Sequence, residues 1–175
     1  PGMHTSRAQK DILTFEINRT TPVQPTSANF IINRFNSGIT FTSSVSIAYQ
    51  KFSPDGRFLA MSSIENNGLV VYNFNNATGQ ITSILANYST AFNLTTGALA
   101  RPMALEFSPN SRFLYVAHPT RNIISQIDLT AQLSAGNPTA INTSPGLGAL
   151  QIGPDLRIYH RGDNHSFIGI IQFPD

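Results

Sequence analysis

The sequence predicts an all-β fold made of repeated antiparallel sheets, and three observations lead to this prediction. One motif occurs three times, at residues 51–60, 106–115 and 151–159, and its prolines, Pro54, Pro109 and Pro154, are separated by 55 and then 45 residues. The chain holds 12 Phe and 5 Tyr, which favour pleated strands. Between the apolar runs stand Asn, Ser, Gly and Pro, which favour turns. Strands and turns repeating at this period are typical of β-propeller blades.

The centre of each motif predicts a hairpin turn. Proline presets φ at the first corner of a turn, Asp or Asn hydrogen-bonds locally, and glycine accepts a positive φ. Ser111 and Leu156 stand where the first repeat has Gly56, which leaves the turn type open in the second and third repeats. The residues expected to build the turns are Pro54, Asp55, Gly56, Pro109, Asn110, Pro154 and Asp155.

Two complete four-stranded blades are expected in the middle of the chain. The segment Asn66-Asn67-Gly68 marks a turn before the third strand of the first blade. The first blade covers residues 45–86, with strands at 47–52, 57–61, 69–74 and 80–85. The second blade covers residues 102–143, with strands at 103–107, 112–117, 122–128 and 139–142.

A partial blade is expected at each end of a single partial propeller that covers residues 1–175. Residues 11–36 match only the third and fourth strands of the other blades, at 11–18 and 30–35. Residues 147–175 match the first three strands, at 147–152, 157–160 and 167–173. Because propellers of roughly 4–8 blades close into a ring, we expect further blades from elsewhere.

Composition narrows the possible functions. With 41% hydrophobic and 11% charged residues, the 175-residue chain resembles neither a disordered segment nor a coiled coil. The net charge of +2 comes from scattered basic residues, so we expect no nucleic-acid partner. The absence of cysteine excludes disulfides and thiolate zinc sites. No apolar run reaches the ~20 residues of a membrane span.

Few side chains suggest chemistry, and we predict neither catalytic residues nor a cofactor. His160, Asp163 and His165 are the one close group of candidate metal ligands, and a polar surface loop is the simpler explanation for them. Arg161-Gly162-Asp163 spells an integrin-recognition tripeptide, but a hairpin tip favours Gly and Asp anyway. Asp55 and Asp155 occupy equivalent turns, which accounts for them without catalysis.

The order of several segments resembles a known family. Phe15 to Asn18 with Pro22-Val23, then Lys51 to Ala60, then Phe74 to Gly79, and the second and third copies of the motif follow one another as in that family. The family is the seven-bladed propeller region, of WD40 or YVTN type, in very large surface proteins of Bacteroidetes. The resemblance implies the C-terminal half of the propeller, export by the type IX system, and a role in gliding motility or adhesion.

We therefore expect a non-enzymatic scaffold or binding module of a secreted or cell-surface bacterial protein. Its expected partners are the remaining blades, from the same parent chain, a second chain or a symmetry mate, and a protein or glycan ligand. The insertion Asn87 to Arg101 is a possible recognition element or a solvated connector. One alternative is a lactonase-like enzyme, in which His118 and Arg121 would face the central channel. Another alternative is a half-propeller that associates with a copy of itself.

Overall fold

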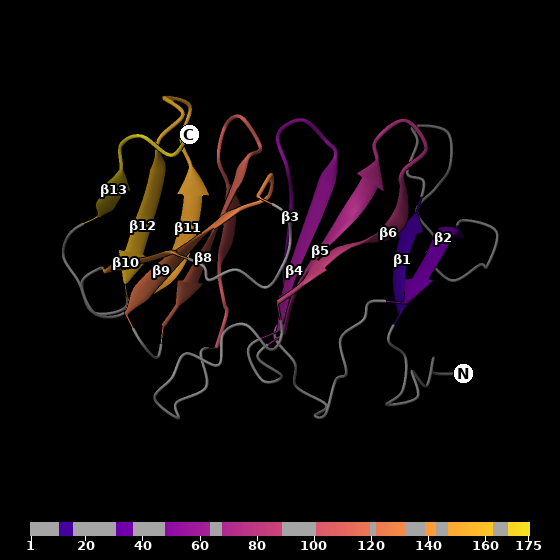
Figure 1. The fold of residues 1–175 in the computed structure, drawn as a ribbon, viewed down its shortest axis with the longest axis horizontal. Coiled ribbons are helices and arrows are strands. Elements are labelled where there is room, and N and C mark those ends of the chain that lie inside the picture. The colour runs from indigo at the N-terminus through magenta and orange to yellow at the C-terminus, as the bar shows by residue number, and fades with distance from the viewer. Residues whose placement is uncertain are drawn as a thin grey trace.

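The computed structural model consists of β-strands joined by turns. It describes residues 11–15, 31–36, 48–63, 68–88, 101–119, 122–131, 139–142, 147–162 and 168–175. Thirteen strands in this described part form four separate antiparallel sheets (Figure 1). The described residues contain no helix that could cross a membrane.

Two of the sheets have four strands each, in sequential order. Their strands pair with the next strand along the chain, as in a meander. The first of these sheets contains β3 (Ala48–Phe52), β4 (Phe58–Ser63), β5 (Gly68–Asn75) and β6 (Gln80–Asn87). The second contains β7 (Leu105–Phe107), β8 (Phe113–His118), β9 (Ile123–Asp128) and β10 (Thr139–Asn142).

The two outer sheets have fewer strands among the described residues. β1 (Asp11–Phe15) pairs with β2 (Ile31–Asn36). β11 (Leu147–Ile152), β12 (Ile158–Gly162) and β13 (Gly169–Ile171) form a sheet in that order. The all-β fold class is therefore confirmed, and within the described residues two four-stranded sheets lie between a two-stranded and a three-stranded one.

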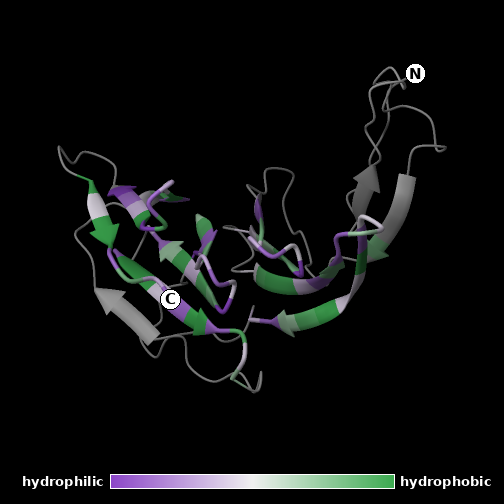
Figure 2. Cartoon of the chain, turned by 90° about the horizontal axis from the view of Figure 1, so that it is seen from above, coloured by the Kyte–Doolittle hydropathy of each residue, from purple (hydrophilic) through white to green (hydrophobic). Residues whose placement is uncertain are grey.

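The four sheets follow one another in chain order along the long axis of the molecule (Figure 1). Seen from above, the described strands lie along an open arc (Figure 2). Turns between the first and second strands of each motif-bearing sheet lie at one end of the strands, at the top of Figure 1. This arrangement places the three copies of the motif on the same side of the molecule.

The core consists of apolar layers between neighbouring sheets. One layer joins the β3–β6 sheet to the β7–β10 sheet and includes Ala60, Val71, Phe107 and Leu114. A second layer lies on the opposite face of the β3–β6 sheet and includes Tyr72, against which Phe35 of β2 packs edge-on. Successive residues of a strand point to opposite faces, so each four-stranded sheet contributes to two layers. The third layer, between the last two sheets, contains Ala104, Tyr115, Ala117, Ile124, Leu150 and Ile158.

Candidate functional site

The three motif turns share one backbone scaffold. In the first, the amide of Gly56 donates to the carbonyl of Ser53 over 2.9 Å, which closes a β-turn around Pro54 and Asp55. The amides of Ser111 and Leu156 make the same contact in the other two turns, over 2.9 and 3.0 Å. The predicted turn prolines and acidic or amide residues therefore occupy equivalent places in all three repeats.

Side chains inside the first two turns stabilise them in the same way. The hydroxyl of Ser53 donates to the carboxylate of Asp55 over 2.7 Å and accepts from the amide of Phe58 over 2.9 Å. In the second turn, Ser108 donates to Asn110 over 2.7 Å, and its hydroxyl accepts from the Phe113 amide over 2.9 Å. Burial raises the pKa of Asp55, but hydrogen bonds from Ser53 and Arg57 lower it more, so its carboxylate stays ionised. These polar groups have a structural role.

The third turn is one residue shorter, which the sequence alignment missed. The amide of Gly153 donates to the carbonyl of Arg157, whereas Ser53 donates to Phe58 in the first turn. Ile158 therefore faces the layer shared with the preceding sheet, as Leu59 does, although the motif aligns it with Phe58. A Cβ at position 153 would lie 2.6 Å from the Tyr159 ring, so glycine is needed there. The freed space lets the Tyr159 hydroxyl donate to Asp155 over 2.7 Å.

All three turns contain a residue in the left-handed region at the same place. The φ angles are 70° at Gly56, 63° at Ser111 and 63° at Leu156. Glycine adopts this conformation freely, whereas a residue with a Cβ pays roughly 1–2 kcal/mol. Ser111 gains a contact in exchange, because its hydroxyl accepts from the Asp55 amide of the preceding sheet over 3.1 Å. Leu156 is exposed and has no such polar group.

We predict that Leu156→Gly stabilises the protein by about 0.5–1 kcal/mol, because relief of the left-handed backbone exceeds the entropy gained by the unfolded chain. Urea unfolding followed by circular dichroism measures this change. Gly56→Ala is the matched control and should destabilise, since its new Cβ would also lie 3.0 Å from the side chain of Asn76. A loss of stability in Leu156→Gly would contradict this account.

The turns are connected from sheet to sheet. The Asp55 amide bonds to Ser111 of the next turn, and the Asn110 amide donates to the carboxylate of Asp175 over 3.0 Å. Asp175 thus supplies the oxygen that Leu156 lacks. The neighbouring Pro174 carbonyl accepts from the hydroxyl of Tyr115 over 2.9 Å. These contacts fix the relative position of adjacent sheets at the end where the turns lie.

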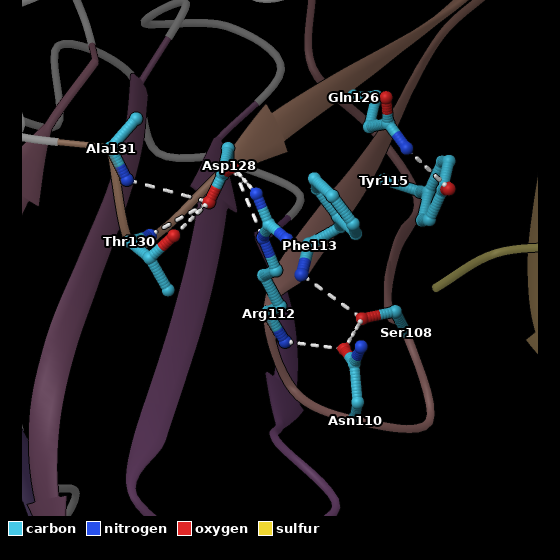
Figure 3. A network of polar contacts seen from close by, with 9 residues as sticks. All are labelled: Ser108, Asn110, Arg112, Phe113, Tyr115, Gln126, Asp128, Thr130 and Ala131. Atoms are coloured by element: carbon cyan, nitrogen blue, oxygen red, sulfur yellow. Dashed lines mark hydrogen bonds and ion pairs between the residues drawn. The ribbon is translucent and has the colours of Figure 1, made fainter.

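A polar network links the motif turn of the β7–β10 sheet to the turn after β9 (Figure 3). The guanidinium of Arg112 donates to Asp128 on β9 over 2.7 and 3.1 Å, and it stacks on the Phe113 ring with 4.8 Å to the centroid. Asp128 also accepts from the amide and hydroxyl of Thr130, over 2.9 and 2.7 Å, which closes the turn after β9. The hydrogen bond from Arg112 is the main cause that holds the pKa of Asp128 below its ordinary value of 3.8.

The lowered pKa of Asp128 predicts that the free energy of unfolding decreases at acidic pH. A carboxyl group whose pKa is depressed by folding stabilises the protein above its unfolded pKa and loses that contribution as pH falls through the folded value. Wild type should therefore lose stability below pH 3.8, the ordinary value. Asp128→Asn should be less stable than wild type at neutral pH and show a shallower acid dependence. Urea unfolding midpoints measured from neutral to acidic pH test this. If the midpoint changed equally with pH in wild type and in Asp128→Asn, the prediction would be wrong.

A buried carboxylate joins the first strands of three sheets. Glu106 on β7 is almost fully buried. Its Oε2 atom accepts from the Ile152 amide of β11 and pairs with the Lys51 ammonium of β3, each over 2.8 Å. Its Oε1 atom accepts from the Phe107 amide over 3.1 Å. Glu106 thereby satisfies amides at the open edges of first strands, which otherwise would lack partners.

The contacts of Glu106 with Lys51 and Ile152 were not predicted from the sequence, although the repeat contains a pattern that indicates them. Lys51 and Glu106 occupy the same position of the motif, 55 residues apart, and Gln151 follows 45 residues later. Opposite charges at one repeat position indicate a contact between neighbouring repeats. The chemistry available to the cluster is ion pairing and hydrogen bonding between strands.

The histidines lie within strands where the structure describes them. His118, considered for a lactonase-like channel, is fully buried at the end of β8, and its Nε2 atom lies 2.9 Å from the hydroxyl of Ser125. His160 is in β12 and lies against Gly169, where a Cβ would overlap the imidazole. Burial lowers the pKa of His160 below 6.5. Within the described residues, no three His, Asp or Glu side chains form a group suited to a metal ion.

Several predicted positions lie outside the described residues. Arg161 is exposed in β12 and Gly162 ends that strand, but Asp163 of the tripeptide is not described. The same holds for His165 of the possible metal group and for Arg121 of the lactonase-like alternative. Most of the segment from Asn87 to Arg101 is likewise outside the described part.

Comparison with known proteins identifies the fold. No protein-family model and no curated protein sequence matches the chain. A solved putative 6-phosphogluconolactonase from Bacteroides uniformis is similar, with a TM-score of 0.55 and 14% identity over 94% of this chain and 48% of that one. The Cps50 (Swd1) β-propeller domain of Myceliophteria thermophila has a TM-score of 0.56 and 10% identity over 81% of this chain and 41% of its own.

Hydrazine synthase of Kuenenia stuttgartiensis is a third similar structure. Its TM-score is 0.52, with 18% identity over 78% of this chain and 36% of that chain. The chain therefore spans less than half the length of each of these neighbours. At such identities the likeness concerns the fold alone. The fold is a partial β-propeller, in which the described residues form two four-stranded antiparallel blades with a two-stranded sheet on one side and a three-stranded sheet on the other.

Proposed function

We propose that this chain is a non-enzymatic scaffold and binding module, and that it forms part of a larger propeller. The observation that carries this proposal is that the polar side chains considered for catalysis make stabilising contacts within the protein. Asp55 and Asp155 hold turns, Glu106 joins the first strands of three sheets, and His118 is buried beside Ser125. Side chains engaged in this way stabilise a rigid frame, and frames of this kind present loops to a partner.

The proposed setting is an exported or cell-surface bacterial protein in which further blades complete the ring. The resemblance to propeller regions of Bacteroidetes surface proteins supports this setting, with adhesion or gliding as the role and a protein or glycan as the ligand. The partial blades on both sides of the two complete ones support the need for further blades. Propellers close so that their sheets leave only short, protected edges.

Hydrolysis of sugar lactones provides a direct test. We expect the purified chain to hydrolyse a panel of sugar lactones no faster than buffer, because His118 cannot reach a substrate from its buried place. His118→Gln, which keeps a hydrogen-bonding side chain beside Ser125, is the matched variant. Turnover by the chain that is lost in His118→Gln would replace the scaffold proposal by an enzymatic one. Intact mass and terminal sequencing of the native protein test whether further blades belong to the same polypeptide.

A further inference from the structure

The tip of the third motif turn exposes an apolar side chain that the other two turns lack. Leu156 is 59% exposed, and it stands where the first turn has Gly56 and the second has Ser111. Glycine has no side chain at this place. Ser111 is buried, and its hydroxyl accepts a hydrogen bond from the Asp55 amide. Of these three residues, Leu156 alone places a large side chain in solvent.

The exposed leucine also has a strained backbone. Its φ angle of 63° lies in the left-handed region, where the Cβ of an ordinary residue crowds the following carbonyl oxygen. Glycine would adopt the same turn without this cost, and the leucine side chain is not buried in return. Backbone strain that brings no structural benefit is typical of functional sites. The side chain of Leu156 therefore calls for a functional explanation.

The next residue, Arg157, has a guanidinium that is less engaged than those of its counterparts. In the first turn, Arg57 donates a hydrogen bond to Asp55 and stacks on the aromatic ring that follows it in the chain. Arg112 of the second turn is likewise hydrogen-bonded to an aspartate and stacked on the following ring. The Nε atom of Arg157 instead lies 3.8 Å from Oδ2 of Asp155, which is beyond hydrogen-bond distance.

Two features of the shortened turn leave this guanidinium without such contacts. The hydroxyl of Tyr159 donates to the same Oδ2 atom of Asp155 over 2.7 Å. The residue after Arg157 is Ile158, which has no aromatic ring and is fully buried. Within the described part of the chain, the guanidinium of Arg157 therefore makes neither a hydrogen bond nor a ring contact. Its N–H groups can donate to an acceptor from outside the chain.

From these two observations we propose that Leu156 and Arg157 bind a protein segment that combines apolar side chains with a carboxylate. The proposal rests on the proposed function and names the loop that binds and the chemistry of its partner. Leucine packs against the apolar side chains, and the guanidinium pairs with the carboxylate through two parallel hydrogen bonds. Arginine is among the residues that most often dominate binding at protein interfaces. A leucine side chain forms no hydrogen bonds with sugar hydroxyls, which favours a protein over a glycan.

The probe is a phage-displayed library of random peptides, selected on the full chain. We expect the selected peptides to combine aromatic or aliphatic residues with Asp or Glu. Measured by fluorescence anisotropy, a synthetic copy of the most enriched peptide should bind Leu156→Gly and Arg157→Gln at least about tenfold more weakly than wild type. Leu156→Gly is expected to be more stable than wild type, so its loss of binding would not reflect unfolding. Arg57→Gln is the matched control and should bind as wild type does, because Arg57 already pairs with Asp55.

Several results would overturn the proposal. If no peptide were selected, or if the peptides bound Leu156→Gly as tightly as wild type, the third turn would not be the binding site, and the scaffold role would remain. If Arg57→Gln weakened binding as much as Arg157→Gln, general positive charge would explain the binding. Binding to a glycan array that is lost in Leu156→Gly would make the partner a glycan, and dimerisation lost in that variant would make it a second copy. Lactone turnover would contradict the proposed function alone and would leave the peptide result unaffected.

Discussion

Phe107→Ala is expected to lower the free energy of unfolding by about 3–5 kcal/mol, a large share of the 5–15 kcal/mol that stabilises an ordinary domain. Phe107 is 0% exposed and lies in the layer between the two complete blades. Alanine would remove its apolar surface and leave a cavity that the two rigid sheets cannot close. Urea unfolding followed by circular dichroism measures the effect.

Phe52→Ala is the matched control because Phe52 occupies the same position of the motif. It is 51% exposed, and its ring lies 4.7 Å from that of Phe74. Its removal should cost about 1 kcal/mol, the value of an aromatic contact at a half-exposed site. Equal losses in the two variants would show that packing between blades does not determine stability, contrary to the structure.

Glu106→Ala is expected to cost about 2–4 kcal/mol. The substitution leaves the Ile152 and Phe107 amides without their acceptor and Lys51 without its counter-ion. Glu106→Gln should cost less, since its one carbonyl oxygen can still accept from the Ile152 amide. A double-mutant cycle with Lys51→Met measures how much of the loss belongs to the ion pair.

The matched control for Glu106 is Gln151, which holds the equivalent place in the last blade and is exposed. Gln151→Ala should change stability by no more than about 0.5 kcal/mol, as is usual at the surface. If Glu106→Ala destabilised the protein no more than Gln151→Ala, the Glu106 carboxylate would not join the first strands of the three sheets in solution. The pair of variants therefore isolates the contribution of the buried contacts.

The repeated motif made the strands predictable because each strand ends at a turn that the sequence marks clearly. The strands 139–142 and 147–152 were predicted with the bounds that the structure has. The shortened third turn was not predicted, since aligning Arg157 with Arg57 requires no gap in the sequence. The hydrogen bond from Gly153 to Arg157 and the pairing of Ile152 with Ile158 show that one residue is missing after Leu156.

The candidate site was less predictable than the fold, because its contacts join residues far apart in the chain. The turn residues were recognised from local chemistry, and the structure places Asp55, Asn110 and Asp155 in equivalent turns. The bond from Asn110 to Asp175 depends on how two blades lie side by side, which the turn motif alone does not specify. The left-handed conformation of Leu156 contradicts its side-chain preference and is imposed by the surrounding hairpin.

The bonds between successive turns have a consequence for how the chain comes apart. Each blade is held chiefly by its immediate neighbours, so the loss of one junction removes support from the next and not from the whole array. Unfolding should then begin at the first or the last sheet and proceed sheet by sheet, so that the junction around Phe107 separates last. Hydrogen exchange of backbone amides should therefore be slowest in β4, β5 and β8, and measuring it tests this order of unfolding.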